Sequence, residues 1–133
     1  MDIVNKEKRS KIMSGIRGKN TTPEILLRKS LFEDGLRYRI HYKLPGKPDI
    51  VFPSRKIAIF VNGCFWHGHG CELDHNPKIN SSFWRLKKSN NKKRDIKNCK
   101  KLIKLGWKYH IVWECKIYED LTKEKEKIKN MLN

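Results

Sequence analysis

The feature that most constrains the fold is one short apolar run, Ile57-Ala58-Ile59-Phe60-Val61. Side chains of a strand alternate between its two faces, so a run that is apolar at every position predicts a central strand covered on both sides. Helices must supply that cover. The run is far shorter than the roughly 20 apolar residues that a membrane-spanning helix needs, so we expect no membrane association of that kind.

Capping and stop signals around this run predict the helices. We expect helices at residues 5–17, 22–34, 82–105 and about 120–132. The second should begin with a hydroxyl cap on Thr22, followed by proline and an acid, and end at Gly35. The long third helix should take Ser82 as its cap and Gly106 as its stop.

Alternating polarity and turn residues predict four strands. They cover residues 36–40, 49–52, 57–61 and 107–113. In the first, Leu36, Tyr38 and Ile40 alternate with arginines, as in a half-exposed strand. The order is helix, three strands, helix, strand, helix. It predicts an α/β fold with a mixed β-sheet flanked by helices, in a single domain over residues 1–133 that starts with a basic N-terminal arm at residues 1–20.

The charge of the chain names a class of partner. It has 31 Lys and Arg against 14 Asp and Glu, a net charge of +17. A compact chain with this excess repels itself unless an anionic partner offsets it, which indicates nucleic acid, an anionic membrane surface or an acidic protein. A hydrophobic content of 38% excludes a disordered basic tail. The N-terminal MDIVNKEKRSK lacks the apolar segment of a signal peptide, so we expect a cytoplasmic protein.

Metal-ligand residue types cluster after the central strand. Within twelve residues lie Cys64, His67, His69, Cys71 and His75, and Cys115 follows the last predicted strand. Three thiolates and one imidazole, from Cys64, His69, Cys71 and Cys115, complete a tetrahedral zinc site with no open position for catalysis. Ordinary buried thiols are the alternative, and the clustered spacing favours structural zinc. His67 then stays available for chemistry, and Cys99 is expected in the core.

The few acids are isolated among basic residues. Asp49 is the only acid between Gly35 and Cys71, and Asp95 the only one between His75 and Trp113. Helical spacing turns Asp95 and Glu24 toward apolar positions, so the three acids can converge. In a basic protein that binds phosphates, convergent acids are best explained by Mg²⁺, with His67 placed to deprotonate water. The alternatives are that Glu24 complements a helix dipole and that Asp95 pairs with Arg94 or a lysine.

Three aromatic residues lie beside these positions. Phe65 and Trp66 separate Cys64 from His67, and Trp84 opens the long basic helix. Exposed aromatics in a basic setting stack on bases or wedge between them. Core packing is the alternative, and we expect it for Trp107 and Trp113.

Four segments carry a resemblance that covers nearly the whole chain: RSKIMSGIRGKNTTPE, LPGKPDIVF, IFVNGCFWHGHGC and GWKYHIVWEC. With them the chain resembles the very short patch repair DNA mismatch endonuclease family. The resemblance implies a fold similar to type II restriction endonucleases. It also implies a Mg²⁺-dependent enzyme that recognises a T·G mismatch left by deamination of 5-methylcytosine and nicks the strand 5′ to the mismatched T. Such an enzyme acts as a monomer on double-stranded DNA and is functionally linked to a DNA cytosine-5 methyltransferase.

The resemblance also implies roles by motif position. Asp49 would bind Mg²⁺, His67 would be the base, and Asp95 and Glu24 would support the site. Zinc ligands would be Cys64, His69, Cys71 and Cys115, residues that enter the DNA stack would be Phe65, Trp66 and Trp84, and the minor-groove arm would include Arg9, Lys11, Met13, Ile16 and Arg17. The second acid and lysine of the wider nuclease pattern would fall on Phe60-Val61-Asn62, which has neither. The main-chain carbonyl of Val61 is the expected replacement as a metal ligand.

Two alternatives remain beside the mismatch endonuclease. A less selective nuclease with the same core would cut DNA without a mismatch. A zinc-stabilised DNA-binding protein would need the basic arm, the aromatics and the zinc, but would have no use for a buried Asp49.

Overall fold

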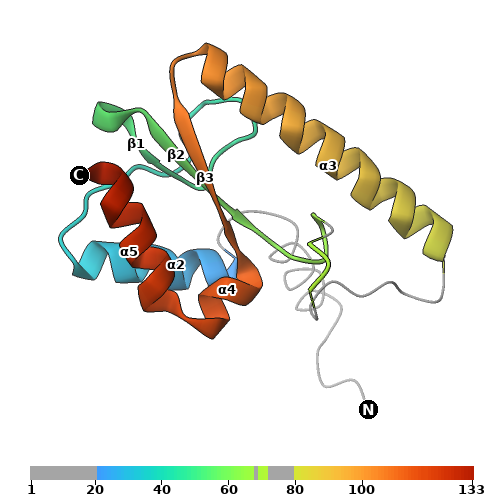
Figure 1. The fold of residues 1–133 in the computed structure, drawn as a ribbon, viewed down its shortest axis with the longest axis horizontal. Coiled ribbons are helices and arrows are strands. Elements are labelled where there is room, and N and C mark those ends of the chain that lie inside the picture. Colours follow the sequence, from blue (N-terminus) through green and yellow to red (C-terminus); the bar gives the residue numbers. More distant parts are fainter. Residues whose placement is uncertain (1–20, 68, 72–79) are drawn as a thin grey trace, which may run out of the picture.

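A three-stranded mixed sheet forms the centre of the molecule (Figure 1). The computed structural model describes residues 21–67, 69–71 and 80–133. The strands are β1 (Ile50–Phe52), β2 (Ile57–Asn62) and β3 (Lys108–Trp113), in the order β1-β2-β3. β1 runs antiparallel to β2, and β2 parallel to β3, so that Ile59 is paired with Ile50 on one side and His110 on the other. The apolar run is the central strand, as predicted.

Helices cover both faces of this sheet (Figure 1). They are α2 (Thr22–Glu33), α3 (Ser81–Lys104), α4 (Glu114–Glu119) and α5 (Leu121–Leu132), and a single 3₁₀ turn, η1 (Pro53–Arg55), joins β1 to β2. The predicted α/β fold with a mixed, helix-flanked sheet is confirmed. Within the described residues, no helix is long and apolar enough to cross a membrane.

The alternation of side chains along β2 divides the core into two layers. Ile57 and Ile59 point into the larger layer, which also holds buried residues of β1, β3 and the helices α2, α4 and α5. Ala58 points the other way and packs with Val51 and with Leu102 of α3. The two-faced burial expected from the sequence is what places α3 on one side of the sheet and the other helices opposite.

Both long helices end at the predicted glycines. The amide of Gly35 donates to the carbonyl of Phe32 at 2.9 Å, and the amide of Gly106 to that of Ile103 at 3.0 Å. The amide of the next residue donates to the carbonyl one residue further back, Leu36 to Leu31 at 3.1 Å and Trp107 to Leu102 at 3.0 Å, which completes a Schellman motif in each case. Both glycines have a φ of +84°, where a side chain would be strained.

The starts of α2 and α3 are each displaced from the predicted residue. The N-cap of α2 is Thr21 rather than Thr22, and Asn80 rather than Ser82 caps α3; neither makes a side-chain capping bond. Pro23 has no N–H, which removes one donor that a capping hydroxyl at Thr21 would use. Asn80 has a left-handed backbone rather than the extended one that capping requires.

The predicted strand at 36–40 is wrong. Arg39 makes one isolated bridge, to Val51, with both backbone bonds at 2.9 Å, and no ladder follows. β1 is only three residues long, and it is followed by Pro53, which has no N–H to donate to a neighbouring strand. His41, with a φ of +57°, turns the chain away on the other side. The alternation of Leu36 and Tyr38 toward the core is nevertheless observed.

The short helix α4 was not predicted, because its six residues offer less than two turns of periodicity. Only Ile117 within it is buried. The last helix agrees with the prediction, with Asp120 as its N-cap accepting the amide of Lys123 at 3.1 Å. The helix predicted at 5–17 lies outside the described residues.

The loop before β1 packs closely against the sheet at the turn formed by residues 44–47. Gly46 has a φ of +81°, and a Cβ there would lie 3.1 Å from both Phe60 and Asn98. We therefore predict that Gly46→Ala lowers the free energy of unfolding by about 2–4 kcal/mol, from backbone strain plus overpacking. Denaturant unfolding measures it.

Gly35→Ala is the matched control. Gly35 has a similar positive φ but open space around it, so only strain remains, about 1 kcal/mol. Equal losses for the two variants would contradict the packing assigned to Gly46.

Candidate functional site

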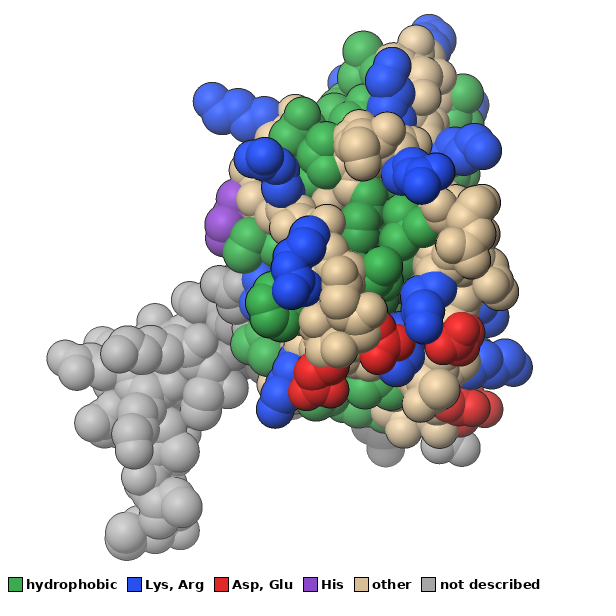
Figure 2. All heavy atoms as spheres, turned by 90° about the vertical axis from the view of Figure 1, so that its left-hand side faces the viewer, with side chains coloured by type: hydrophobic (Ala, Val, Ile, Leu, Met, Phe, Trp, Pro, Cys, Tyr) green, Lys and Arg blue, Asp and Glu red, His purple; other side chains and the backbone are tan. Residues whose placement is uncertain are grey.

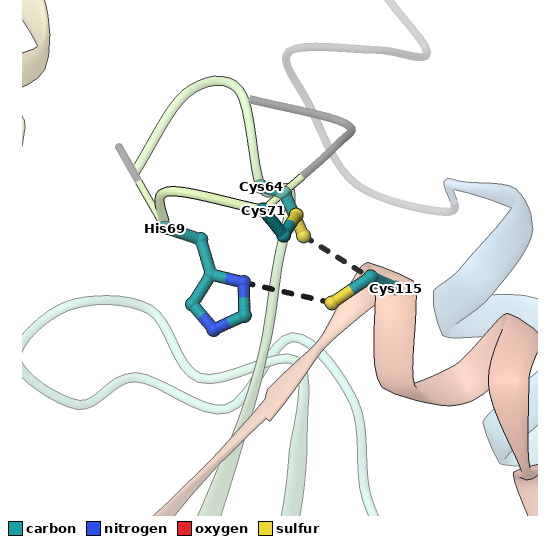
Figure 3. Close-up of side chains that lie close together, drawn as sticks. All are labelled: Cys64, His69, Cys71 and Cys115. Atoms are coloured by element: carbon teal, nitrogen blue, oxygen red, sulfur yellow. Dashed lines mark hydrogen bonds between the residues drawn. The ribbon is translucent and has the colours of Figure 1, made fainter. Parts of the chain in front are cut away.

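A cluster of three cysteines and one histidine joins the ends of β2 and β3 (Figure 3). The possible ligand atoms of Cys64, His69, Cys71 and Cys115 all lie within 4.8 Å of one another. Sγ of Cys115 is 3.5 Å from Nδ1 of His69, and the amide of Cys115 donates to Sγ of Cys64 at 3.4 Å. The structure thus brings together the four residues that the sequence nominates as zinc ligands. His75 lies outside the described residues.

The spacing of these atoms fits zinc. With Zn–S near 2.3 Å and Zn–N near 2.0 Å, tetrahedral ligand atoms of the two kinds lie about 3.6 Å apart. Burial raises the pKa of Cys64 to about 12. The neighbouring thiols also raise it, so thiolates here require a cation to be stable. The cluster could therefore hold a metal such as zinc.

Two further side chains hold this cluster in place. The imidazole of His69 stacks on Trp113, with ring centroids 4.0 Å apart and planes at 11°. Oε1 of Glu114 accepts the amide of Cys64 at 3.2 Å. Trp113, expected in the core, is instead half-buried and stacks on a member of the cluster, and no local pattern singled out Glu114.

Two of the three predicted acids meet beside the start of β1. Glu24 of α2 is only 3% exposed, and its carboxyl is hydrogen-bonded to that of Asp49. Oδ2 of Asp49 accepts the amide of Val61 at 2.7 Å. Burial and, after it, the neighbouring Glu24 raise the pKa of Asp49, to about 8 in all, although the Val61 amide and Arg28 oppose the shift. A carboxyl in this condition requires a cation before it ionises at neutral pH.

A small cavity of about 10 Å³ lies against this acid pair, room for about one water molecule. It is lined by Glu24, Arg28, Ile40, His41, Lys47, Pro48 and Asp49. The basic members were not nominated from the sequence. The dense basic background hides Arg28 and Lys47, and His41 shows itself only through its positive φ of +57°.

The third acid pairs with the candidate base. Nδ1 of His67 and Oδ2 of Asp95 are 2.5 Å apart, and both side chains are largely shielded, at 20% and 27% exposed. Arg94 approaches the other oxygen of Asp95 at 3.9 Å. The three acids do not converge on one point: among the described residues, the cysteine cluster is the only group of three or more potential ligands. Asp95 instead pairs with His67, because α3 crosses the sheet on the face opposite α2.

The three nominated aromatics form one cluster at the N-terminal part of α3. Ring centroids are 4.9 Å apart for Phe65 and Trp66, 5.4 Å for Phe65 and Trp84, and 5.6 Å for Trp66 and Trp84. The Lys88 ammonium lies 4.4 Å from the Phe65 ring centre. Asn91 donates to the carbonyl of Trp66 at 2.9 Å and thus ties the loop to the helix, a contact the sequence did not reveal.

Basic side chains are not confined to the site. Lys and Arg also stand on the face seen in Figure 2, which is turned away from the N-terminal end of α3, while acidic side chains gather in its lower part. Net charge alone therefore does not locate the functional surface. The acid pair, the His67–Asp95 pair and the aromatic cluster mark the candidate functional surface.

Comparison with known proteins gives concordant similarities. Residues 1–73 match the family model described as DNA mismatch endonuclease Vsr. The chain is 42% identical over 133 residues to the type II nicking enzyme V.XorIIP of Xanthomonas oryzae pv. oryzae, covering 99% of this chain and 97% of the relative. It is 49% identical to the nicking enzyme V.NmeAIP of Neisseria meningitidis, over 87% and 84% of the two chains.

Two further matches extend this picture. The DNA mismatch endonuclease Vsr of Escherichia coli K12 is 40% identical, over 92% of this chain and 81% of its own. Among solved structures, the catalytic domain of homing endonuclease I-Bth0305I matches with a TM-score of 0.56 at 20% identity, over 84% of this chain and 94% of that chain. The last likeness concerns the fold alone and confirms a restriction-endonuclease-like core.

We predict that the purified protein carries one equivalent of zinc. Cys115→Ser should lose the zinc and at least about 3 kcal/mol of stability, because metal binding to a site absent from the unfolded chain stabilises the fold. Atomic emission and denaturant unfolding measure the two quantities. Cys99→Ala is the control: Cys99 is buried on α3 outside the cluster, so its zinc content should not change. Full zinc content in Cys115→Ser would contradict the assignment.

The acid pair predicts a pH dependence of stability for the zinc-loaded protein without magnesium. The pKa of Asp49 rises from 3.8 to about 8 on folding, so between these values the folded state holds a proton that the unfolded state has lost. The contribution of Asp49 to the free energy of unfolding is therefore greatest below about pH 4, and it falls as the pH rises toward 8. Asp49→Asn should flatten this slope, measured as unfolding free energy against pH. The same slope in both proteins would contradict the burial argument.

Proposed function

Because the chain belongs to the Vsr DNA mismatch endonuclease family, an endonuclease family that acts on DNA, we propose that it nicks double-stranded DNA at T·G mismatches. The cut lies 5′ to the mismatched T and the reaction requires Mg²⁺. Such mismatches arise when 5-methylcytosine deaminates, so the enzyme would start very short patch repair at sites of a DNA cytosine-5 methyltransferase.

The observation that carries the proposal is the pairing of Asp95 with His67 in the loop that follows β2, the strand whose Val61 amide binds Asp49. β2 connects the two: the amide of Val61 binds Asp49, and His67 follows six residues later in a loop that the metal cluster closes. A DNA-binding module has no need for both a largely buried, desolvated carboxyl and a carboxylate-paired imidazole.

The His67–Asp95 pair supplies a general base. With Asp95 accepting a hydrogen bond from Nδ1–H, the lone pair of the imidazole is on Nε2. Nε2 then takes the proton of a water molecule while the water oxygen forms a bond to phosphorus. The bond from phosphorus to the leaving sugar oxygen breaks, and that oxygen receives a proton from solvent. Asp95 stabilises the imidazolium that forms.

Asp49 and the carbonyl of Val61 would hold Mg²⁺, with Glu24 beside them. The carbonyl of Ile59 accepts the amide of Asp49 at 3.0 Å, so the polar groups of Ile59 point toward β1. Val61, two residues on, points the same way, which places its carbonyl on the side of Asp49. When bound there, Mg²⁺ supplies charge that stabilises the attacked phosphate and lowers the pKa of water. Asp49 fits this role because its largely buried carboxyl, with a pKa raised to about 8, requires additional positive charge to ionise at neutral pH.

The aromatic cluster supports recognition of distorted DNA. Phe65, Trp66 and Trp84 are half-buried, held by Asn91 and Lys88, and so form a rigid wedge. Wedging costs least where stacking is already weak, as at a mismatch. The N-terminal arm, with Arg9, Lys11, Met13, Ile16 and Arg17, would lie in the minor groove, and one protein molecule would serve each site; the arm is outside the described residues.

We predict that the protein nicks a T·G duplex in Mg²⁺ much faster than the matched T·A duplex. Asp49→Ala and His67→Ala should each lower the single-turnover nicking rate by at least about 10²-fold, because each removes a group that acts in the transition state. Denaturing gels of end-labelled duplexes give the rates and the cut position.

His110→Gln is the control, since this half-buried histidine lies on β3 facing α5 and should leave the rate unchanged. Equal nicking of T·G and T·A duplexes would instead indicate an unselective nuclease. Duplex binding without any Mg²⁺-dependent product would indicate a zinc-stabilised DNA-binding protein.

A further inference from the structure

Arg28 lies against the acid pair, although the sequence did not single it out. Its guanidinium Nη2 is 3.5 Å from Oε2 of Glu24, one helical turn earlier on α2. It also lines the small cavity beside Asp49, and its charge is close enough to favour the ionised form of that carboxyl. Arg28 is therefore part of the site's electrostatics.

The position of Arg28 is well defined. Its side chain is 14% exposed, in contrast with His41 and Lys47, the other basic residues on the cavity wall, which are exposed. The hydroxyl of Tyr38 donates to the Arg28 carbonyl at 3.2 Å and packs the loop after α2 against this turn of the helix. A guanidinium held in place in a shielded site acts without reorganising when charge develops nearby.

The end of β2 at the site carries no positive charge. β2 ends in Phe60, Val61 and Asn62, none of which is ionisable. An attacked phosphodiester gains negative charge as the water oxygen adds, and two carboxylates beside it oppose that gain. A fixed cation near those carboxylates lowers the cost.

We propose that Arg28 is an electrostatic residue of the nuclease site: from α2, it supplies the fixed positive charge that stabilises the phosphate undergoing attack near Asp49. The inference rests on the proposed function. The positive charge of Arg28 stabilises the phosphate together with the metal ion. Because both are cations, Arg28 also repels the metal ion.

A merely structural role for Arg28 predicts a different pattern. If Arg28 only held Glu24 in place, its loss would disorder the acid pair and weaken metal binding. If Arg28 acts through its charge, its loss removes a cation that competes with the metal, so the metal binds more tightly while the chemical step slows. Opposite effects on binding and rate distinguish the two roles.

The test compares Arg28→Gln, Arg28→Lys and the control Lys29→Gln in zinc-loaded protein. Lys29 is exposed on the same helix and carries the same charge. For Arg28→Gln we expect a fall of about 10²-fold in the single-turnover nicking rate, with duplex affinity unchanged. We expect severalfold tighter Mn²⁺ binding by calorimetry. Arg28→Lys should restore most of the rate, and Lys29→Gln should match the wild type in both measurements.

An unchanged rate in Arg28→Gln, or weaker Mn²⁺ binding, would overturn the inference. If the wild type nicks no duplex, the proposed function fails separately. In that case the calorimetry still decides on the charge of Arg28, since unchanged or weaker Mn²⁺ binding contradicts it.

Discussion

The cluster of Cys64, His69, Cys71 and Cys115 joins the ends of two parallel strands, and the rest of the site depends on that junction. Parallel pairing holds β2 and β3 along their length but does not define the loop that leaves β2. Phe65, Trp66 and His67 lie in that loop, between two members of the cluster. Because this loop carries Phe65, Trp66 and the proposed base His67, a metal at this junction would hold these three residues in place relative to the sheet.

The sheet supplies the second half of the arrangement. Asp49 precedes β1, where antiparallel pairing with β2 brings its carboxyl to the amide of Val61. α2 then adds Glu24 and Arg28 from one face, while α3 adds Asp95 from the other. The acids thus approach the end of β2 from opposite layers, and the buried central strand is what separates them. In a chain with a net charge of +17, the proposed role of these acids in holding Mg²⁺ explains why they are retained in a protein that binds DNA.

Sequence reasoning succeeded where one local signal decides the outcome. The all-apolar run identified the central strand, Gly35 and Gly106 identified helix ends, and ligand chemistry identified the metal cluster. It failed where tertiary context decides. The alternation at 36–40 correctly predicted which side chains face the core but wrongly predicted a strand, because β1 is too short to pair further. Among 31 basic residues, nothing local distinguishes Arg28 from its neighbours; only its place beside Glu24, on the wall of the cavity next to Asp49, shows it.

The most direct test of this account follows nicking as zinc is removed. The zinc-loaded protein is treated with increasing chelator, and bound zinc, affinity for a T·G duplex and Mg²⁺-dependent single-turnover nicking are measured on the same samples. We predict that nicking falls in proportion to bound zinc and returns when zinc is restored, because the loop with His67 depends on the cluster. Nicking at an undiminished rate in zinc-free protein would contradict it.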